Sequence, residues 1–130
     1  MDRCNLCEEF AQILGGMILS QDPCTVLRLR DINATILGRS SRSSLTRGAL
    51  FSFESPDAQG RTLNLGETVI LQDEINPFIS ALREQDIFVT ALHNHWLFDE
   101  PRLFYIHFDS IDDPIEFARK TATAFELLTD

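Results

Sequence analysis

The sequence lacks the features that mark several large classes of protein. It has no apolar run of about 18 residues that would span a membrane, and no cationic start followed by an apolar stretch that would mark a signal peptide. It also lacks a P-loop, a dinucleotide-binding glycine motif and a G-x-S-x-G nucleophile motif. These absences predict a cytoplasmic protein outside the common nucleotide-binding and serine-hydrolase classes.

Cysteine is scarce as well. The chain has three cysteines, and an odd number does not predict a disulfide framework. Cys4 and Cys7 have C-x-x-C spacing, but without a second such pair the spacing is a weak zinc signal. A redox pair would be expected after a strand, whereas this pair precedes every predicted strand. We therefore expect reduced cysteines on the opening helix, and assign no role to Cys24.

Positive charge is also in short supply. The net charge of −9 argues against binding to nucleic acids or to an anionic membrane surface. Residues 28–47 are the exception, because they contain five arginines and one acid: Arg28, Arg30, Arg39, Arg42 and Arg47 against Asp31. Such a basic island could hold an anionic ligand, or it could be a solvated strand face and loop.

Length and composition predict one domain over residues 1–130. The hydrophobic fraction of 44% and the charged fraction of 24% are those of an ordinary globular protein. A chain of 130 residues can build one substantial core but not two. Ten phenylalanines predict that aromatic packing dominates this core.

The first half of the chain predicts one helix followed by strands. Residues 5–15 have apolar side chains at helical spacing and end at two glycines. Strands are predicted over residues 24–31, 48–54 and 62–72. The stretch 39–44, rich in serine and arginine, has loop composition and is predicted to be the most flexible segment.

The second half predicts the order strand–helix–strand–strand–helix. The first of these helices spans residues 73–85, with Asp73 as its N-cap, and strands follow at 87–95 and 103–109. The last helix begins at Asp113, which a proline and an acidic residue follow within the first turn. We therefore expect an α+β domain with a mainly antiparallel sheet and about three helices, packed mostly on one face.

All three histidines lie within fifteen residues, on the last two predicted strands. His93 and His95 share a face because strand side chains alternate. If residues 97–102 form a hairpin loop, opposed residues have numbers that sum to about 200, and an even sum places His107 on that same face. The face predicted to pack on the core carries Phe88, Leu92, Phe104, Ile106 and Phe108. The face predicted to carry the histidines also carries Val89, Ala91, Tyr105 and Asp109.

This arrangement predicts a three-ligand metal site. Imidazole is the commonest metal ligand in proteins, and a catalytic zinc uses three protein ligands and leaves a fourth position to water or substrate. The alternative is that His93 or His95 is half-buried and makes structural hydrogen bonds. The letters of residues 93–95 spell HNH, but the nuclease of that name needs a metal finger and a basic surface that this sequence does not predict.

Glu74 is the predicted carboxylate partner of the histidines. It lies with Asp73 where the strand 62–72 enters a helix, and a strand end could reach the histidine face. Glu74 would then be a fourth ligand or a general base that acts on bound water. The alternative for both acids is a helix N-terminus, where the macrodipole and capping favour negative charge.

Several motifs resemble a known family. The motifs are Asp73-Glu74-Ile75-Asn76-Pro77, Thr90-Ala91-Leu92-His93-Asn94-His95, Glu100-Pro101-Arg102 and Tyr105-Ile106-His107. Together they resemble the bacterial LppY/LpqO-type family, a domain of unknown function found alone or in tandem. The resemblance extends over nearly the whole chain and is most specific over residues 69–107.

The resemblance implies which positions carry the family signature. These are Glu74, Asn76, Pro77, Thr90, His93, Asn94, His95, Pro101, Arg102 and His107. Named members resemble exported lipoproteins, a location that this chain's start does not predict. Because the family has no established activity, the resemblance supports a site at the histidines without naming a reaction.

The sequence therefore favours a small metal-binding protein with a possible reaction on a small molecule. We expect zinc at His93, His95 and His107, with metal-dependent hydrolysis or a lyase step as the reaction. Arg102 and Tyr105 are candidate ligand-binding residues. The alternative is a non-catalytic module that binds an anionic small molecule through the histidines and Arg28, Arg30 or Arg102. A homodimer formed through an exposed sheet face is a third interpretation.

Overall fold

Six antiparallel strands form the main sheet, in the order β1-β2-β5-β6-β9-β7. The computed structural model describes residues 3–129, and side chains from residue 6 onward. The strands of this sheet are β1 (Met17–Gln21), β2 (Cys24–Leu29), β5 (Gly48–Glu54), β6 (Thr62–Leu71), β7 (Phe88–His93) and β9 (Leu103–Asp112). The five predicted strands are present, β7 ends earlier than predicted, and β1 was not predicted.

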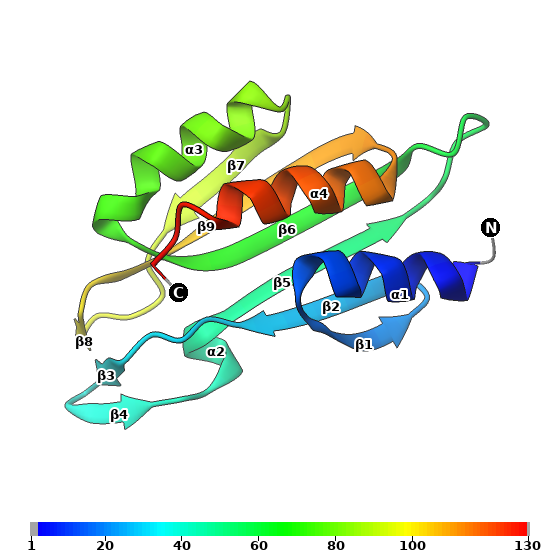
Figure 1. The fold of residues 1–130 in the computed structure, drawn as a ribbon. Coiled ribbons are helices and arrows are strands. Elements are labelled where there is room, and N and C mark those ends of the chain that lie inside the picture. Colours follow the sequence, from blue (N-terminus) through cyan, green and yellow to red (C-terminus); the bar gives the residue numbers. More distant parts are fainter. Residues whose placement is uncertain (1–2, 130) are drawn as a thin grey trace.

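The longer helices cover one face of this sheet (Figure 1). They are α1 (Arg3–Leu14), α3 (Ile75–Glu84) and α4 (Pro114–Phe125), and two short helical turns, α2 (Ser44–Arg47) and η1 (Gln72–Glu74), complete the set. The helix predicted to start at Asp73 begins instead as the 3₁₀ turn η1 and becomes α-helical at Ile75. The α+β fold with a mainly antiparallel sheet is confirmed.

The core lies between the helices and the sheet. Phenylalanines dominate it, as predicted: Phe78 packs edge-to-face on Phe108 and on Phe125, with ring centroids 5.9 and 5.5 Å apart. Gly66 has no side chain at the point where the Phe108 ring lies against β6, so that ring occupies the space that a Cβ would need. The even-numbered residues of β9 therefore face the helices, and its odd-numbered residues face away from them.

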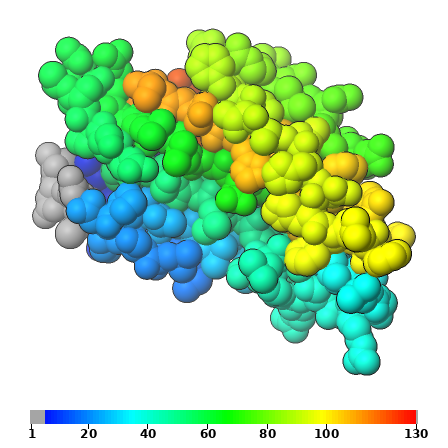
Figure 2. All heavy atoms as spheres, turned by 180° about the vertical axis from the view of Figure 1, so that it is seen from behind, coloured from blue at the N-terminus to red at the C-terminus, as the bar shows by residue number. Residues whose placement is uncertain are grey.

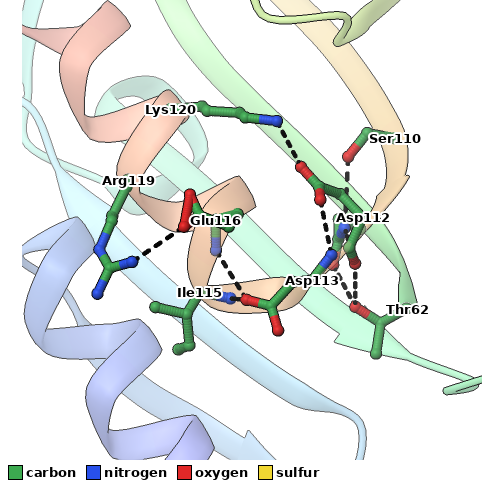
Figure 3. Close-up of polar contacts among 9 residues, drawn as sticks. Thr62, Ser110, Asp112, Asp113, Ile115, Glu116, Arg119 and Lys120 are labelled. Atoms are coloured by element: carbon green, nitrogen blue, oxygen red, sulfur yellow. Dashed lines mark hydrogen bonds and ion pairs between the residues drawn. The ribbon is translucent and has the colours of Figure 1, made fainter. Parts of the chain in front are cut away.

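Hydrogen bonds fix the turn from β9 into α4 (Figure 3). The Asp113 carboxylate accepts hydrogen bonds from the backbone N–H groups of Ile115 and Glu116, both at 3.0 Å, and so caps α4 as predicted. Lys120 Nζ lies 2.7 Å from a carboxylate oxygen of Asp112. The Thr62 hydroxyl donates to the Asp112 carbonyl oxygen, so β6 is tied to the same turn.

A second, three-stranded sheet packs against the other face of the main sheet at one end. It consists of β3 (Ala34–Ile36), β4 (Arg39–Ser41) and β8 (Asp99–Glu100), in the order β4-β3-β8. A small apolar cluster joins the two sheets: Ile32, Ala34, Val69, Leu103 and Tyr105, with Leu71 and Trp96 beside it. The prediction that residues 39–44 form a loop was wrong for β4, because pairing with β3 orders its backbone.

The cysteine prediction was also wrong. Cys7 on α1 and Cys24 on β2 form a disulfide with their Cα atoms 5.6 Å apart, and both residues are buried in the core. The sequence could not predict this pair because α1 and β2 become neighbours only through the tertiary fold. The side chain of Cys4, the other half of the C-x-x-C pair, lies outside the described residues.

None of the helices in residues 3–129 is both long enough and apolar enough to cross a membrane.

Candidate metal centre

The register between β7 and β9 decides which side chains share a face. His93 lies opposite Tyr105, and Ala91 lies opposite His107. These residue numbers sum to 198, an even number close to the predicted value, so His93 and His107 face the same side. That side is the outer face, by which we mean the face of the main sheet opposite α1, α3 and α4.

A bulge at Thr90 breaks this register. Below the bulge, Phe88 lies opposite Asp109 and Val89 lies opposite Phe108. Val89 therefore packs on the core, whereas Phe88 is 58% exposed. The predicted faces of these two residues were wrong because the sequence carries no signal for the extra residue, which shifts the alternation by one position.

The three histidine rings lie together on the outer face. The His93 ring centroid is 4.9 Å from that of His95 and 4.9 Å from that of His107. One ring nitrogen from each residue can be chosen so that all three lie within 4.8 Å of one another. This histidine cluster, His93, His95 and His107, could hold a metal ion.

His95 reaches the cluster although it lies beyond the end of β7. Its ring is held parallel to the Tyr105 ring, with centroids 3.9 Å apart and planes 3° from parallel. The Tyr105 hydroxyl accepts a hydrogen bond from Trp96 Nε1 and donates one to the Thr46 carbonyl oxygen, both at 2.8 Å. Burial raises the pKa of Tyr105, so the hydroxyl stays protonated as this donor. Tyr105 therefore positions His95, and its hydroxyl is already committed to these two partners.

Two observations favour metal binding by these imidazoles. The Nε2 atom of His107 is buried and has no hydrogen-bond partner, which is uncommon for a buried polar atom. Burial lowers the pKa of His95, and the neighbouring His93 lowers it further, while Glu67 opposes these effects. The neutral form is the one that binds a metal ion.

The structure does not bring Glu74 to the histidines. Arg30 Nη1 and Nη2 donate to its two carboxylate oxygens at 3.0 and 2.9 Å, and the backbone N–H groups of Leu71 and Thr129 donate to the same oxygens. Burial raises the pKa of Glu74, but these hydrogen bonds outweigh it and hold the pKa below its ordinary value. We therefore reassign Glu74 from the metal centre to a buried ion pair that joins η1 to the segment after β2.

The arginines considered for anion binding also lie elsewhere. Arg102 pairs with Asp99, not with Glu100, and so stabilises the segment between β8 and β9. Arg28 lies over the ring of Phe125, on the helical side of the sheet. Arg30 is fully buried in the ion pair with Glu74.

Glu67 is the carboxylate that lies beside the cluster. It is directly opposite His107 in the pairing of β6 with β9, and it is half-buried. Directly opposed Cβ atoms in such a pair are about 5 Å apart. The sequence contained one signal for Glu67, because it is the single charged residue of β6. That signal could not predict that Glu67 lies opposite His107.

A pocket adjoins the cluster on the outer face. It has a volume of about 370 Å³, and we call it the outer-face pocket. Its lining residues come from β2, β5, β6, β7 and β9: Thr25, Leu50, Phe51, Ser52, Leu65, Gly66, Glu67, Thr90, His107, Phe108 and Asp109. Figure 2 shows this face, where the green residues of β6 lie in a hollow between the blue β1–β2 hairpin and the yellow segment after β7. His107 thus belongs both to the histidine cluster and to the wall of a pocket.

Comparison with known proteins gives a family but no activity. A search of curated proteins and a search of solved structures found no significant match. The family model described as "Domain of Unknown Function (DUF1259)" matches residues 8–127, which include every strand, the histidine cluster and the outer-face pocket. The chain therefore belongs to this family of unknown function.

Proposed function

We propose that this protein binds a divalent metal ion, preferably zinc, through one nitrogen each from His93, His95 and His107. The observation that carries the proposal is the convergence of three ring nitrogens within 4.8 Å of one another. In addition, Nε2 of His107 is buried and has no hydrogen-bond partner. Nitrogen ligands of a tetrahedral zinc lie about 3.3 Å from one another, given Zn–N bonds of about 2.0–2.1 Å. Small side-chain rotations of the exposed His93 and His95 would close the difference.

Three protein ligands leave a fourth position for water or substrate, which is the arrangement of catalytic zinc sites. The outer-face pocket adjoins the histidine cluster, because His107 belongs to both. Glu67, directly opposite His107, would be the residue that accepts and returns a proton, and a metal ion held by the three histidines would supply Lewis-acid chemistry. We therefore propose metal-assisted hydrolysis of a small molecule as the reaction. A lyase step would use the same carboxylate as its base.

The anion-binding alternative has little support from the surroundings of the cluster. None of the arginines in the described residues lines the outer-face pocket, and two of the pocket residues are acidic. Arg28 and Arg30 lie on the helical side of the sheet or inside it. A negatively charged ligand would therefore meet repulsion unless a metal ion were bound first.

Within its family, we propose that this chain is of the LppY/LpqO type. The support is the set of motifs over residues 69–107 that resemble that type, of which the histidines line the proposed centre. A small molecule is the proposed partner, and the acidic net charge of −9 argues against nucleic acids and anionic membranes. A homodimer stays a prediction.

The Cys7–Cys24 disulfide favours an oxidising compartment over the cytoplasm that the sequence predicts, because disulfides persist mainly in oxidising environments. Alkylation of the denatured protein without reductant, followed by peptide mapping, checks this point. We expect Cys7 and Cys24 to be protected until a reductant is added. Alkylation of both residues without reductant, in protein denatured directly from its natural host, would instead support the cytoplasmic prediction.

Metal content tests the proposed function directly. Protein purified without a histidine tag should contain close to one metal ion per chain by elemental mass spectrometry, after reconstitution with zinc where necessary. The double substitution His93→Ala/His95→Ala should abolish this binding, whereas Phe88→Ala, an exposed residue of the same strand, should not. Absence of bound metal in the reconstituted wild type would overturn the proposal.

A further inference from the structure

We propose that the outer-face pocket takes a small ligand that carries a positive charge, such as an alkylamine or a guanidine, and presents the ligand's other end to the histidine cluster. This inference rests on the proposed function, because it names the substrate class of the same site. It is carried by the two carboxylates of the pocket and by the placement of the charged residues around it.

The sheet register shows how the pocket joins the cluster. Leu50, Glu67 and His107 lie directly opposite one another on the outer face, on the neighbouring strands β5, β6 and β9, and form one row across the sheet. The adjacent row carries Ser52, Leu65 and Asp109. Rows on one face are two residues apart along a strand, which is about 7 Å. A ligand of a few carbon atoms can therefore span from the cluster to both acidic side chains.

The charge of the pocket has one sign. Glu67 and Asp109 are its only acidic or basic lining residues apart from His107. Within residues 3–129, neither carboxylate forms an ion pair with a lysine or arginine. Both residues are half-buried, in a concave site where the low-dielectric wall strengthens their field. Two unneutralised carboxylates at diagonal positions of neighbouring strands repel each other, and a cation placed between them removes that repulsion.

The rest of the lining limits the size and character of the ligand. A volume of about 370 Å³ is near the lower end for sites that bind small molecules. Leu50 and Leu65 offer apolar contacts, while Thr25, Ser52 and Thr90 offer hydroxyl groups. These groups suit a short hydrocarbon body with one charged end. They do not suit a polyanion such as a nucleotide.

Three matched hydroxamates test the inference on the zinc-loaded protein. They are 3-aminopropanohydroxamic acid, butyrohydroxamic acid and the monohydroxamic acid of succinate. Each has the same zinc-binding group, and their tails of similar length are positive, neutral and negative. We expect the amine to bind on the order of tenfold more tightly than the neutral compound in isothermal titration calorimetry, and the carboxylate to bind most weakly.

Variants show whether the two carboxylates cause this order. Glu67→Gln and Asp109→Asn, made separately, should each reduce the preference for the amine. Glu116→Gln, at an exposed residue of α4 far from the pocket residues, should leave it unchanged. Zinc content and thermal unfolding of each variant establish that it is folded and loaded, and two independent variants keep the test valid if one fails to fold.

The outcomes separate this inference from the proposed function. If the protein takes up no zinc, the proposed metal site itself is overturned. If it holds zinc but none of the three compounds binds in a zinc-dependent way, the metal site stands and this inference is overturned. If all three bind through zinc with equal affinity, or if the carboxylate binds most tightly, the metal site stands and the inference of a cationic ligand is overturned. A preference for the amine that survives both substitutions would also overturn it.

Discussion

The substitution Glu74→Ala separates the two roles considered for this residue. As a metal ligand or base, Glu74 would be needed for binding or turnover but contribute little to folding. As the partner of Arg30, it would be needed for folding and be irrelevant to metal affinity. The structure supports the second role, because Arg30 and Glu74 have side-chain exposures of 0% and 3% and share two hydrogen bonds.

The expected size of the effect follows from burial. Removing one partner of a buried ion pair leaves the other charge without compensation and lowers the free energy of unfolding by about 3–5 kcal/mol. Leu71 and Thr129 would lose their acceptor as well. For a chain of 130 residues, this loss lowers the melting temperature by on the order of 10–20 °C. Asp73→Ala, at the exposed neighbouring acid, should change stability by less than about 1 kcal/mol.

The ion pair determines whether the free energy of unfolding rises or falls with pH. The folded-state pKa of Glu74 lies below its ordinary value of 4.5. A carboxylate with a depressed pKa contributes stability above its unfolded-state pKa, and that contribution is lost as the pH falls through the folded-state pKa. The difference in unfolding free energy between wild type and Glu74→Gln should therefore be largest near pH 7 and shrink below about pH 4.5.

Urea unfolding and zinc titration of the same preparations measure both quantities. We expect Glu74→Ala to lose stability while it keeps the zinc affinity of the wild type at a temperature where it is folded. A variant that unfolds like the wild type but no longer binds zinc would refute the assignment to the ion pair. It would also return Glu74 to the metal centre.

Three further predictions concern the centre and the sheet that supports it. Tyr105→Phe removes the hydroxyl that bonds to Trp96 but keeps the ring beside His95. The unfolding free energy should therefore fall by about 1–3 kcal/mol, while zinc binding is retained. Loss of zinc binding without loss of stability would contradict this prediction. Gly66→Ala would place a Cβ 2.3 Å from a carbon of the Phe108 ring and should lower the unfolding free energy by about 1–3 kcal/mol in chemical denaturation. A neutral effect would show that the ring has room to move. The pKa of His95 is lowered by burial and by its histidine neighbours, so its neutral form persists below its ordinary pKa of 6.5. Zinc affinity, measured by competition with a chelator, should therefore fall only at acidic pH, where protons displace the metal. An affinity that is independent of pH between about 5 and 7.5 would argue against imidazole ligands.

Local sequence was sufficient for the three longer helices, for five strands of the main sheet and for the shared face of His93 and His107. Asp113 followed by proline and an acidic residue specified the start of α4, because capping depends on residues within one turn. The alternation of a strand and the parity of a hairpin placed His93 and His107 on one face. Both are short-range properties, which is why they could be predicted without a fold.

Contacts between distant segments decided the rest. Glu67 lies beside His107 through pairing of two strands 40 positions apart, and Arg30 reaches Glu74 from 44 positions away. The Cys7–Cys24 disulfide likewise needs α1 to lie on β2. The alternation pattern of a strand shows which side chains share a face but not which strand lies beside it. The sequence alone therefore determined that His93 and His107 share a face. Only the tertiary structure decided that His95 joins them by stacking on Tyr105 and, through the register of β6 on β9, which carboxylate lies next to them.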